Sequence, residues 1–388
     1  MTTLRVGIIG TGFIARTHVD SFRRACLLFR DLDTEVEIVA VADIALQAAQ
    51  AFASAMSIPK AVDQWQALVT DPAIDLIDIA TPNNLHFPIA MAAIEQGKAV
   101  YCEKPLSLTR EEADTMTAAA KAKGVRTFVA FNNVFAPSTQ LAKTLIERGD
   151  IGRPVQFTGT FDQGFYSDTE LPASWRTRVA EAGSGALGDL GSHVVSIAQY
   201  LLGAITSVAA LDAIVFKDRP LPGSGMGYHA KANTDATRQR VENDDIVKAL
   251  VRFESGAFGS IGASRIAAGR VFGINWEIQG TEGGLYVENE RANELHVFRM
   301  NDPHDERGFK TILCGSQVDG FKQGFFGFDY GGGGIGYFDV KVLEIRGMLK
   351  ALKNSDEWFC DFAFGRDNQA VVDAIGASAA AGGSMLQV

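Results

Sequence analysis

The chain has 388 residues, enough for two ordinary domains, and its 47% hydrophobic and 21% charged residues are typical of a globular protein. Its formal net charge of −10 argues against a general nucleic-acid binder and an anionic-membrane binder, because both use basic surfaces. No uninterrupted apolar run reaches the roughly 18 residues that a membrane helix needs. We therefore expect neither a nucleic-acid nor a membrane partner.

The N-terminal segment MTTLRVGIIG enters an apolar strand directly, without the charged, apolar and cleavage regions of a secretory signal. The four cysteines are scattered and show neither a CxxC pair nor a metal-like spacing with histidine. We expect reduced thiols, a cytoplasmic location and no metal site.

The first third of the chain alternates short apolar runs with amphipathic helical stretches. Strands are predicted at residues 4–10, 36–43, 76–81, 99–102 and 126–131. Strands that are apolar on both faces and separated by helices indicate a parallel sheet covered on both sides. This pattern predicts a doubly wound dinucleotide-binding domain over residues 1–132.

The hydrophobic pattern changes after about residue 150. Val155, Phe157 and Phe161 alternate with polar neighbours, and VFGINWEIQ (271–279) does the same. A period of two with one polar face indicates an antiparallel sheet covered on one side. One helix interrupts these strands, from Asp189 to about Leu202. A second α/β domain is predicted over residues 133–388.

The stretch GIIGTGFIA has the GxGxxA pattern between a strand and a helix. Gly10 would permit the tight turn, Gly12 would let a pyrophosphate approach the backbone, and Ala15 would allow close helix–sheet packing. The pattern alone is weak, and a packing turn is the alternative. Because it opens a βαβ unit, it favours a dinucleotide site.

Asp43 ends the second predicted strand, where a carboxylate accepts hydrogen bonds from the adenosine ribose. It lies 28 residues beyond Ala15, farther than the usual interval of about 20, and the alternative is an ordinary loop acid. A carboxylate would repel a 2′-phosphate, and no arginine follows it directly. NAD is therefore favoured over NADP.

Two polar motifs, ATPNNLH (80–86) and EKP (103–105), follow strands of the same predicted sheet. Ligands bind beyond the carboxyl ends of such strands, so both motifs are expected beside the phosphate turn. Pro105 restricts the backbone of Lys104, which suggests a lysine held rigidly where nicotinamide and substrate meet. The alternative is a surface pair of Glu103 with Lys104, which would contribute little to stability. His18, on the first predicted helix, receives no role.

The stretch GSGALGDLGSH (183–193) places Asp189 and His193 four residues apart, on one helix face. Gly185, Gly188 and Gly191 would leave room for a ligand against the backbone. A histidine with an aspartate one turn away suits proton transfer, although such pairs are more often structural.

Together, GTGFIA, ATPNNLH, CEKPLS and GALGDLGSH resemble the glucose–fructose oxidoreductase/inositol dehydrogenase (Gfo/Idh/MocA) family over essentially the whole chain. The resemblance implies an NAD(P)-dependent sugar or cyclitol oxidoreductase with an N-terminal Rossmann domain. It also implies a second α/β domain with a large, mostly antiparallel sheet and assembly into homodimers or homotetramers. SWR (174–176) and GSGALGD look most like the levoglucosan dehydrogenase branch.

Carried over by position, Lys104 resembles the family's active-site lysine, Pro105 is expected after a cis bond, and Asp189 and His193 resemble its DxxxH pair. The predicted cofactor contacts are Gly10, Gly12, Phe13, Ile14, Asp43, Thr81, Pro82, Asn83, His86, Glu103 and Lys104. The predicted substrate contacts are Asn132, Tyr166, Trp175, Arg176 and His193, and Trp175 could equally be core.

Two departures from the family pattern affect the substrate prediction. Many members have an aspartate where this chain has Ser196, and many have an arginine near Val134 and Phe135. One charged substrate contact is therefore expected to be missing, which argues against assigning inositol, phosphorylated sugars or uronates by analogy.

We predict that a ring secondary alcohol is oxidised to a ketone, or the reverse, with His193 as the base and Lys104 as the donor to the same oxygen. Asp189 would hydrogen-bond the substrate or hold the reactive geometry. A swap of the Lys104 and His193 roles stays open. Two alternatives share the scaffold: an NAD-dependent glycosidase and a non-catalytic dinucleotide-binding regulator.

Overall fold

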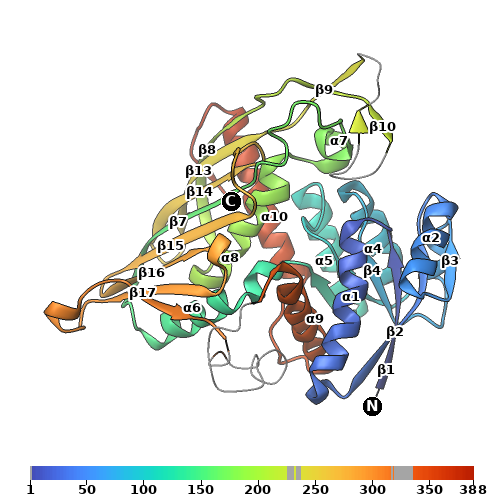
Figure 1. Ribbon diagram of the computed structural model, residues 1–388, viewed down its shortest axis with the longest axis horizontal. Coiled ribbons are helices and arrows are strands. Elements are labelled where there is room, and N and C mark those ends of the chain that lie inside the picture. The colour runs from blue at the N-terminus through green and yellow to red at the C-terminus, as the bar shows by residue number, and fades with distance from the viewer. Residues whose placement is uncertain (1, 225–230, 233–236, 316–317, 319–334) are drawn as a thin grey trace. The chain divides into compact units, whose positions relative to one another are not determined.

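A computed structural model gives the fold and describes residues 2–224, 231–232, 237–315, 318 and 335–388 (Figure 1). The chain divides into two compact units. The first unit contains Met1–Asn132 and Tyr337–Gln369, and the second contains Asn133–Gly336 and Ala370–Val388. No helix among the described residues is long and apolar enough to cross a membrane.

The first unit is built on a parallel sheet of six strands in the order β3-β2-β1-β4-β5-β6, counted within the described residues. The strands are β1 (Thr2–Ile9), β2 (Thr34–Ala42), β3 (Lys60–Val62), β4 (Leu76–Ile79), β5 (Ala99–Cys102) and β6 (Thr127–Val129). All four residues of β4 are buried, as expected for a sheet covered on both faces. The predicted doubly wound sheet is confirmed. The prediction missed β3, whose three residues are too few to show a period.

The helices of this unit up to residue 123 alternate with its strands, and the last two come after all six strands. They are α1 (Phe13–Leu28), α2 (Leu46–Met56), α3 (Gln66–Val69), α4 (His86–Glu95), α5 (Arg110–Lys123), α9 (Tyr337–Lys353) and the first part of α10 (Phe362–Ala380). Short 3₁₀ turns lie at Arg30–Leu32 and Asn83–Leu85. Each helix connection returns the chain to the same edge of the sheet, so the polar motifs after β1, β4 and β5 share that edge.

Helix α9 belongs to the first unit, although it lies more than two hundred residues after β6 in the sequence. It packs beside α1 (Figure 1), where Phe13 and Phe338 meet edge to face with ring centroids 6.0 Å apart. Arg24 also pairs with Asp339 at 2.5 Å. The structure therefore differs from the predicted assignment of all of 133–388 to the second domain, because local periodicity does not show which sheet a late helix covers.

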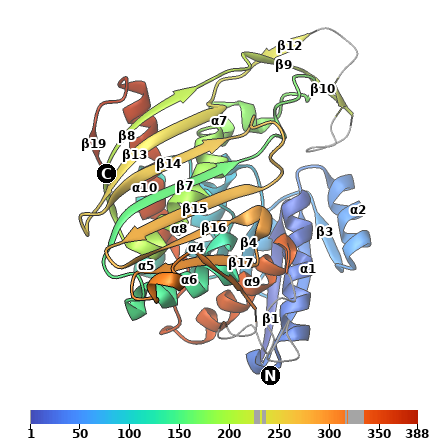
Figure 2. The ribbon, with the colours of Figure 1, turned by 60° about the vertical axis from the view of Figure 1, so that its left-hand side comes forward.

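The second unit contains a sheet of nine strands within the described residues, in the order β18-β17-β16-β15-β7-β14-β13-β8-β19 (Figure 2). Neighbouring strands are antiparallel except β7 and β14, which are parallel. The strands are β7 (Pro154–Asp162), β8 (Ile205–Ala213), β13 (Ile246–Phe253), β14 (Phe258–Ser264), β15 (Gly273–Gly280), β16 (Gly283–Glu288), β17 (Glu294–Arg299), β18 (Lys310–Leu313) and β19 (Leu386–Gln387). The predicted large, mostly antiparallel sheet is confirmed.

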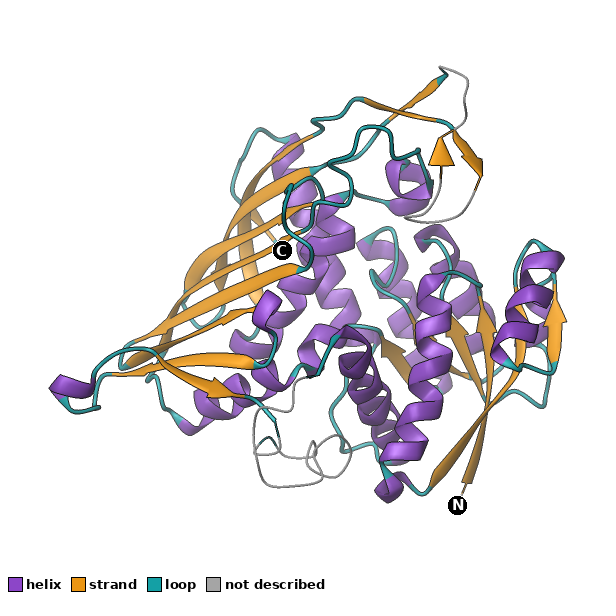
Figure 3. Cartoon of the chain, viewed as in Figure 1, coloured by secondary structure: helices purple, strands orange, loops and turns teal. Residues whose placement is uncertain are grey.

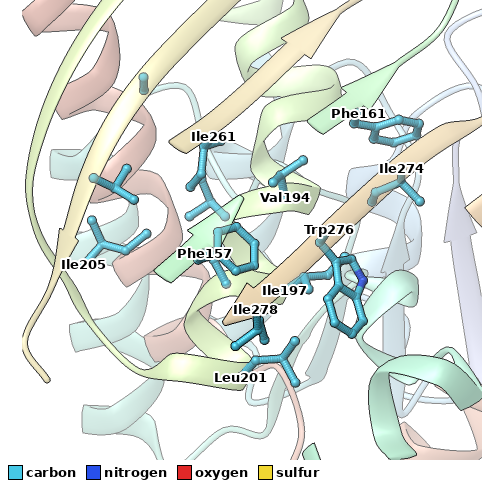
Figure 4. Packing of buried hydrophobic residues seen from close by; sticks show 14 of the residues in the cluster. Phe157, Phe161, Val194, Ile197, Leu201, Ile205, Ile261, Ile274, Trp276 and Ile278 are labelled. Atoms are coloured by element: carbon cyan, nitrogen blue, oxygen red, sulfur yellow. The ribbon is translucent and has the colours of Figure 1, made fainter. Parts of the chain in front are cut away.

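Helices cover one face of this sheet (Figure 3). They are α6 (Pro137–Arg148), α8 (Ser192–Leu202) and the end of α10. Val194, Ile197 and Leu201 on α8 follow helical spacing and pack against Phe157 and Ile278 of the sheet (Figure 4). This apolar layer fixes α8, which carries one of the predicted site residues.

Smaller elements complete the second unit. They are α7 (Val179–Ala182), β9 (Asp218–Pro220), β10 (Pro222–Ser224), β11 (Lys231–Ala232), β12 (Arg238–Arg240) and 3₁₀ turns at Asn132–Phe135, Trp175–Thr177, Asn289–Arg291 and His304–Glu306. A π-helical turn, Leu187–Gly191, directly precedes α8. π turns inside helices often occur at functional positions.

Candidate active site

The glycine turn after β1 has the geometry that a dinucleotide phosphate needs. Gly10 has φ +108°, and a Cβ there would lie 2.3 Å from the Ala80 carbonyl oxygen, so only glycine fits. A Cβ on Gly12 would meet nothing within 4 Å, which leaves the backbone open beside the first residue of α1. The N–H groups at this helix N-terminus favour an anion. Gly10 thus makes a tight turn, as predicted, and the approach of a pyrophosphate at Gly12 stays a prediction.

Asp43 follows β2 directly and is held by two local donors. The Thr11 hydroxyl donates to Asp43 Oδ2 at 2.6 Å, and the Ala45 N–H donates to Asp43 Oδ1 at 3.1 Å. Thr11 lies inside the glycine turn, so this bond ties the phosphate turn to the carboxylate predicted to bind ribose. Thr11 was not predicted, because a hydroxyl between two glycines gives no distinct signal in the sequence.

His86 joins the two polar motifs of the first unit. Its Nδ1 lies 2.9 Å from the Pro105 carbonyl oxygen and its Nε2 lies 3.1 Å from that of Thr81. The ring is fully buried, and burial lowers the pKa of His86. Both ring nitrogens therefore face protein carbonyls. His86 holds the two loops together, where the sequence predicted a direct cofactor contact.

Glu103 and Lys104 follow β5, and their side chains differ in burial and in partners. Lys104 is half-buried, and the Lys104–Pro105 peptide bond is cis, as predicted. The Glu103 carboxylate is buried, and the His18 Nε2 lies 3.0 Å from its Oε1. The structure thus gives Glu103 a protein partner in place of the predicted cofactor contact. Phe13, also predicted to contact the cofactor, is 59% exposed at the start of α1, and Ile14 beside it is half-buried.

Asp189 and His193 occupy the π turn and the first turn of α8 in the second unit. His193 is nearly buried, with its Nδ1 3.1 Å from the Asn133 amide nitrogen and its ring edge to face with Phe161. Asp189 Oδ2 lies 3.7 Å from Nε of Arg176. The histidine ring is therefore held by an amide and an aromatic ring, and the aspartate is associated with a guanidinium.

The segment before this helix is fixed by Asp244. Its carboxylate accepts the Gly185 N–H at 2.6 Å and the Leu187 N–H at 2.8 Å, which satisfies donors at the start of the helical segment. A Cβ on Gly185 would lie 1.9 Å from the Asp244 carbonyl oxygen. The space at Gly185 is therefore filled by protein backbone, and the prediction that this glycine leaves room for a ligand is wrong.

Tyr166 supports the loop that carries Trp175 and Arg176. It is 3% exposed, and its hydroxyl lies 2.9 Å from the Ser174 hydroxyl, which also accepts the Arg176 N–H at 3.3 Å. Its ring packs against two buried guanidinium groups, those of Arg219 and Arg265, at 4.3 and 5.0 Å from the ring centroid. These contacts favour a supporting role for Tyr166 over the predicted substrate contact.

Trp175 and Arg176 form the end of this loop. The Arg176 guanidinium lies 4.3 Å from the centroid of the Trp175 indole, and both side chains are half-buried. Trp175 is therefore neither a core residue nor a fully exposed one. The stacked pair offers an apolar plane and a set of hydrogen-bond donors, which together suit a sugar face and its hydroxyls.

Arg265 and Asp245 form a buried ion pair beneath the same loop. Arg265 Nε donates to Asp245 Oδ1 at 2.8 Å, and both side chains are at most 2% exposed. We expect Arg265→Met to lower the free energy of unfolding by about 3–5 kcal/mol, because it leaves the Asp245 carboxylate buried without its cation. Urea unfolding measures the change.

The matched control for this pair is Arg238→Met. Arg238 pairs with Asp218, but the two side chains are 35% and 53% exposed. Exposed pairs contribute little, so this variant should change the free energy by less than about 1 kcal/mol. A similar loss in both variants would contradict the stabilising role of the buried pair.

Comparison with known proteins agrees with this arrangement. Residues 4–131 match the oxidoreductase family with an NAD-binding Rossmann fold, and residues 139–286 match the GFO/IDH/MocA C-terminal domain. The chain belongs to the Gfo/Idh/MocA family. The predicted membership is confirmed, and the chain is an NAD-binding oxidoreductase of that family.

Three relatives of this Gfo/Idh/MocA protein match it over nearly their whole length. Levoglucosan dehydrogenase of Pseudarthrobacter phenanthrenivorans is 37% identical, covering 98% of this chain and 97% of its own. A crystal structure of an NAD-binding oxidoreductase from Klebsiella pneumoniae is 48% identical with a TM-score of 0.92, covering 100% of this chain and 99% of its own. A levoglucosan dehydrogenase complex with NADH and levoglucosan is 36% identical with a TM-score of 0.92 and the same coverage.

The side chains of this Gfo/Idh/MocA protein fit NAD. Besides the open backbone at Gly12 and the carboxylate of Asp43, the Thr81 Oγ1 is buried and has no hydrogen-bond partner among the described residues. A buried polar atom without a partner is costly, so a ligand is expected to satisfy it. Asn83 beside it is buried and Pro82 is half-buried. Residues of the ATPNN segment would therefore contact the cofactor.

Asn132, predicted to contact substrate, has a similar unmet requirement. It is 2% exposed, and its Nδ2 has no hydrogen-bond partner within the part of the chain that the structure describes. Val134, at a position where many members of the Gfo/Idh/MocA family have an arginine, is fully buried. Asn132 thus offers one amide donor to a ligand. Val134 is an apolar core residue, so it cannot supply the charged substrate contact that an arginine would make.

Proposed function

We propose that this protein is an NAD-dependent dehydrogenase that oxidises a ring secondary hydroxyl of a sugar, anhydrosugar, glycoside or cyclitol to a ketone, or catalyses the reverse. The 37% identity to levoglucosan dehydrogenase over 98% of the chain, together with the residues Lys104, Asp189 and His193, carries the proposal. Curated relatives that act on inositols and on 1,5-anhydro-D-fructose favour the same substrate class. NAD, when bound, accepts the hydride.

We assign the proton-accepting role to His193. Asn133 meets its Nδ1, so the substrate hydroxyl is assigned to Nε2. For Nε2 to accept a proton, Nδ1 must carry the ring hydrogen and donate it to the amide oxygen of Asn133, which requires the amide turned over from its present orientation. Asp189, on the same helix, would hold a substrate hydroxyl with Arg176 beside it.

Lys104 would donate a hydrogen bond to the oxygen that loses its proton. An ammonium group at that position stabilises the developing alkoxide, and a rigid backbone keeps the donor in place before the reaction begins. The reverse assignment, with Lys104 as base and His193 as donor, uses the same residues. Asn132, Trp175 and Arg176 would contact the rest of the ring.

The proposal is tested by NADH formation across a panel of free sugars, anhydrosugars, glycosides and inositols, with NADP in a parallel series. Turnover with NAD and an anhydrosugar or related ring alcohol is expected. A preference for NADP would contradict the role of Asp43. Cleavage of an aryl glycoside without net NADH would favour a glycosidase, and NAD binding without turnover of any substrate would favour a regulator.

We also propose that the protein forms a homodimer or homotetramer through the face of the large sheet opposite its helices. Leu211, Leu250 and Phe258 lie on neighbouring strands of that face and are each more than half exposed, and exposed apolar side chains on one face favour an interface there. Sedimentation velocity should give a dimer or tetramer mass, and a monomer at micromolar concentration would contradict this assignment. The four free cysteines suit the cytoplasmic location that we propose.

A further inference from the structure

Five ionisable side chains are buried together in the first unit, outside the roles assigned above. They are His18 on α1, Asp78 on β4, Glu103 after β5, and Lys341 and Glu344 on α9, each less than 10% exposed. We call them the buried charge cluster. Burying so many charges is costly unless each is paired, and in some proteins such groups serve specificity of structure more than stability. The cluster therefore calls for a reason other than packing.

Glu103 is the centre of this cluster. The Glu103 Oε1 lies 3.0 Å from Nε2 of His18 and 3.3 Å from Nζ of Lys341. Each of these two cations also meets a second carboxylate. His18 Nδ1 lies 2.9 Å from Asp78 Oδ1, and Lys341 Nζ lies 2.8 Å from Glu344 Oε2. One carboxylate oxygen is thus shared between two cations, and each cation has a second carboxylate.

The cluster holds two basic side chains and three carboxyl groups, and their mutual contacts shift several of the pKa values. Burial opposes the charged form of His18, but Asp78 and Glu103 outweigh it and raise the pKa of His18 to about 9. Burial likewise opposes the charged forms of Lys341 and Glu103. Glu344 and then Glu103 outweigh it and raise the pKa of Lys341, while Lys341 and His18 lower the pKa of Glu103. Burial raises the pKa of Glu344. Glu103 is therefore an anion held between two cations.

The second carboxylate oxygen of Glu103 reaches the proposed catalytic lysine. Glu103 Oε2 accepts the backbone N–H of Lys104 at 3.1 Å, and the Glu103 N–H donates to the Ile79 carbonyl at 2.9 Å. One residue further on, the Pro105 carbonyl lies 2.9 Å from the buried His86 ring. The backbone on both sides of Lys104 is thus bonded to buried side chains.

We propose that Lys341 is a positioning residue for Lys104 and acts through Glu103. Its ammonium fixes the Glu103 carboxylate, and that carboxylate fixes the Lys104 backbone from which the reacting ammonium extends. The inference rests on the proposed role of Lys104 in the dehydrogenase. It also explains why a helix more than two hundred residues away in the sequence packs on the Rossmann unit: α9 supplies the cation.

The test is Lys341→Met in the whole 388-residue chain with saturating NAD. We expect kcat to fall by about ten- to a hundredfold, because a small displacement of a catalytic group is enough for such a loss. The NAD dissociation constant should stay unchanged, and the primary deuterium isotope effect on kcat should rise toward its intrinsic value as hydride transfer becomes limiting. A purely structural role would lower the melting temperature and leave the turnover of the folded enzyme intact.

Arg346→Met is the matched control on the same helix. The Arg346 guanidinium lies 3.2 Å from Asp31 and 4.7 Å from the centroid of the Phe29 ring, so this variant removes a cation from α9 away from Glu103. Its kcat should equal that of the wild type. A folded Lys341→Met variant that binds NAD and keeps wild-type kcat overturns the inference.

Two further measurements cover the cases in which Lys341→Met does not fold or the wild type oxidises no carbohydrate. If Lys341→Met does not fold, the double variant Lys341→Met/Glu344→Gln removes one buried carboxylate together with the cation, and the same kinetic criteria apply. If the wild type oxidises no carbohydrate, the proposed function fails, while the position of Lys104 can still be compared by its acetylation rate, read by mass spectrometry. A changed Lys104 rate in Lys341→Met but not in Arg346→Met supports the inference, and equal rates overturn it.

Discussion

Replacing Lys104 by methionine should lower kcat by about a hundred- to a thousandfold while leaving the NAD dissociation constant unchanged. Lys104 is the second residue after β5, and the backbone around it is bonded to Glu103 and His86. These contacts involve the backbone, so the methionine variant keeps them. The loss should therefore fall on the chemical step, where an ammonium stabilises the oxygen that loses its proton.

Lys104→Arg separates the two roles that are open for this lysine. Arginine keeps the positive charge but cannot accept a proton at any ordinary pH. If Lys104 only donates a hydrogen bond, the arginine variant should keep part of the activity. If Lys104 is the base, the arginine variant should be as inactive as the methionine variant.

Steady-state kinetics and NAD titration by fluorescence check both Lys104 variants. Lys60→Met serves as the control, because Lys60 is half exposed and pairs with Asp71 at the surface of the same unit. Its kinetics should match the wild type. Near-wild-type turnover in Lys104→Met would remove Lys104 from the mechanism.

Replacing His193 by glutamine should lower kcat by about a hundred- to ten-thousandfold, the usual range for a general acid or base. Glutamine keeps a polar group near Asn133 but cannot take up a proton. The fall of kcat/KM on the acid side, which reports the base in the free enzyme, should also disappear. Profiles of kcat/KM against pH for the wild type and the variant test both expectations.

Two further variants serve as comparisons for His193→Gln: Asn133→Ala, which should have an intermediate effect, and His304→Gln, which is the control. The alanine variant removes the partner of His193 Nδ1 and should cause a smaller loss than His193→Gln, because the ring stays but its tautomer is no longer set. His304 is exposed in a short 3₁₀ turn, and its replacement should change nothing. An acid-side fall that persists unchanged in His193→Gln would assign the base to another residue.

The sequence predicted those features that depend on local pattern. The glycine turn at Gly10 and Gly12 and the position of Asp189 and His193 on one helical segment follow from spacing within a few residues. The parallel sheet of the first unit follows from the alternation of apolar strands with helices. The cis bond before Pro105 and the role of Lys104 came from the family resemblance. The proposed roles of Lys104, Asp189 and His193 thus rest on local pattern and resemblance together, and they stay predictions.

Features that depend on contacts between distant segments were missed. His18 and Lys341 lie 85 and 238 residues from Glu103 along the chain, so no local period could pair them with it. The same holds for Asp244, whose backbone fills the space beside Gly185. A buried lysine in an amphipathic helix such as α9 was the available signal, since a charge on the apolar face of a helix needs a partner.

The most direct single measurement is the fate of a deuterium placed on the carbon that bears the reacting hydroxyl. The labelled carbohydrate is incubated with the enzyme and NAD, and the nicotinamide is analysed by mass spectrometry together with the sugar product. A dehydrogenase yields one deuterated NADH for each ketone formed. Cleavage or modification of the sugar with no net NADH, the label returning to the product, would contradict the proposed function.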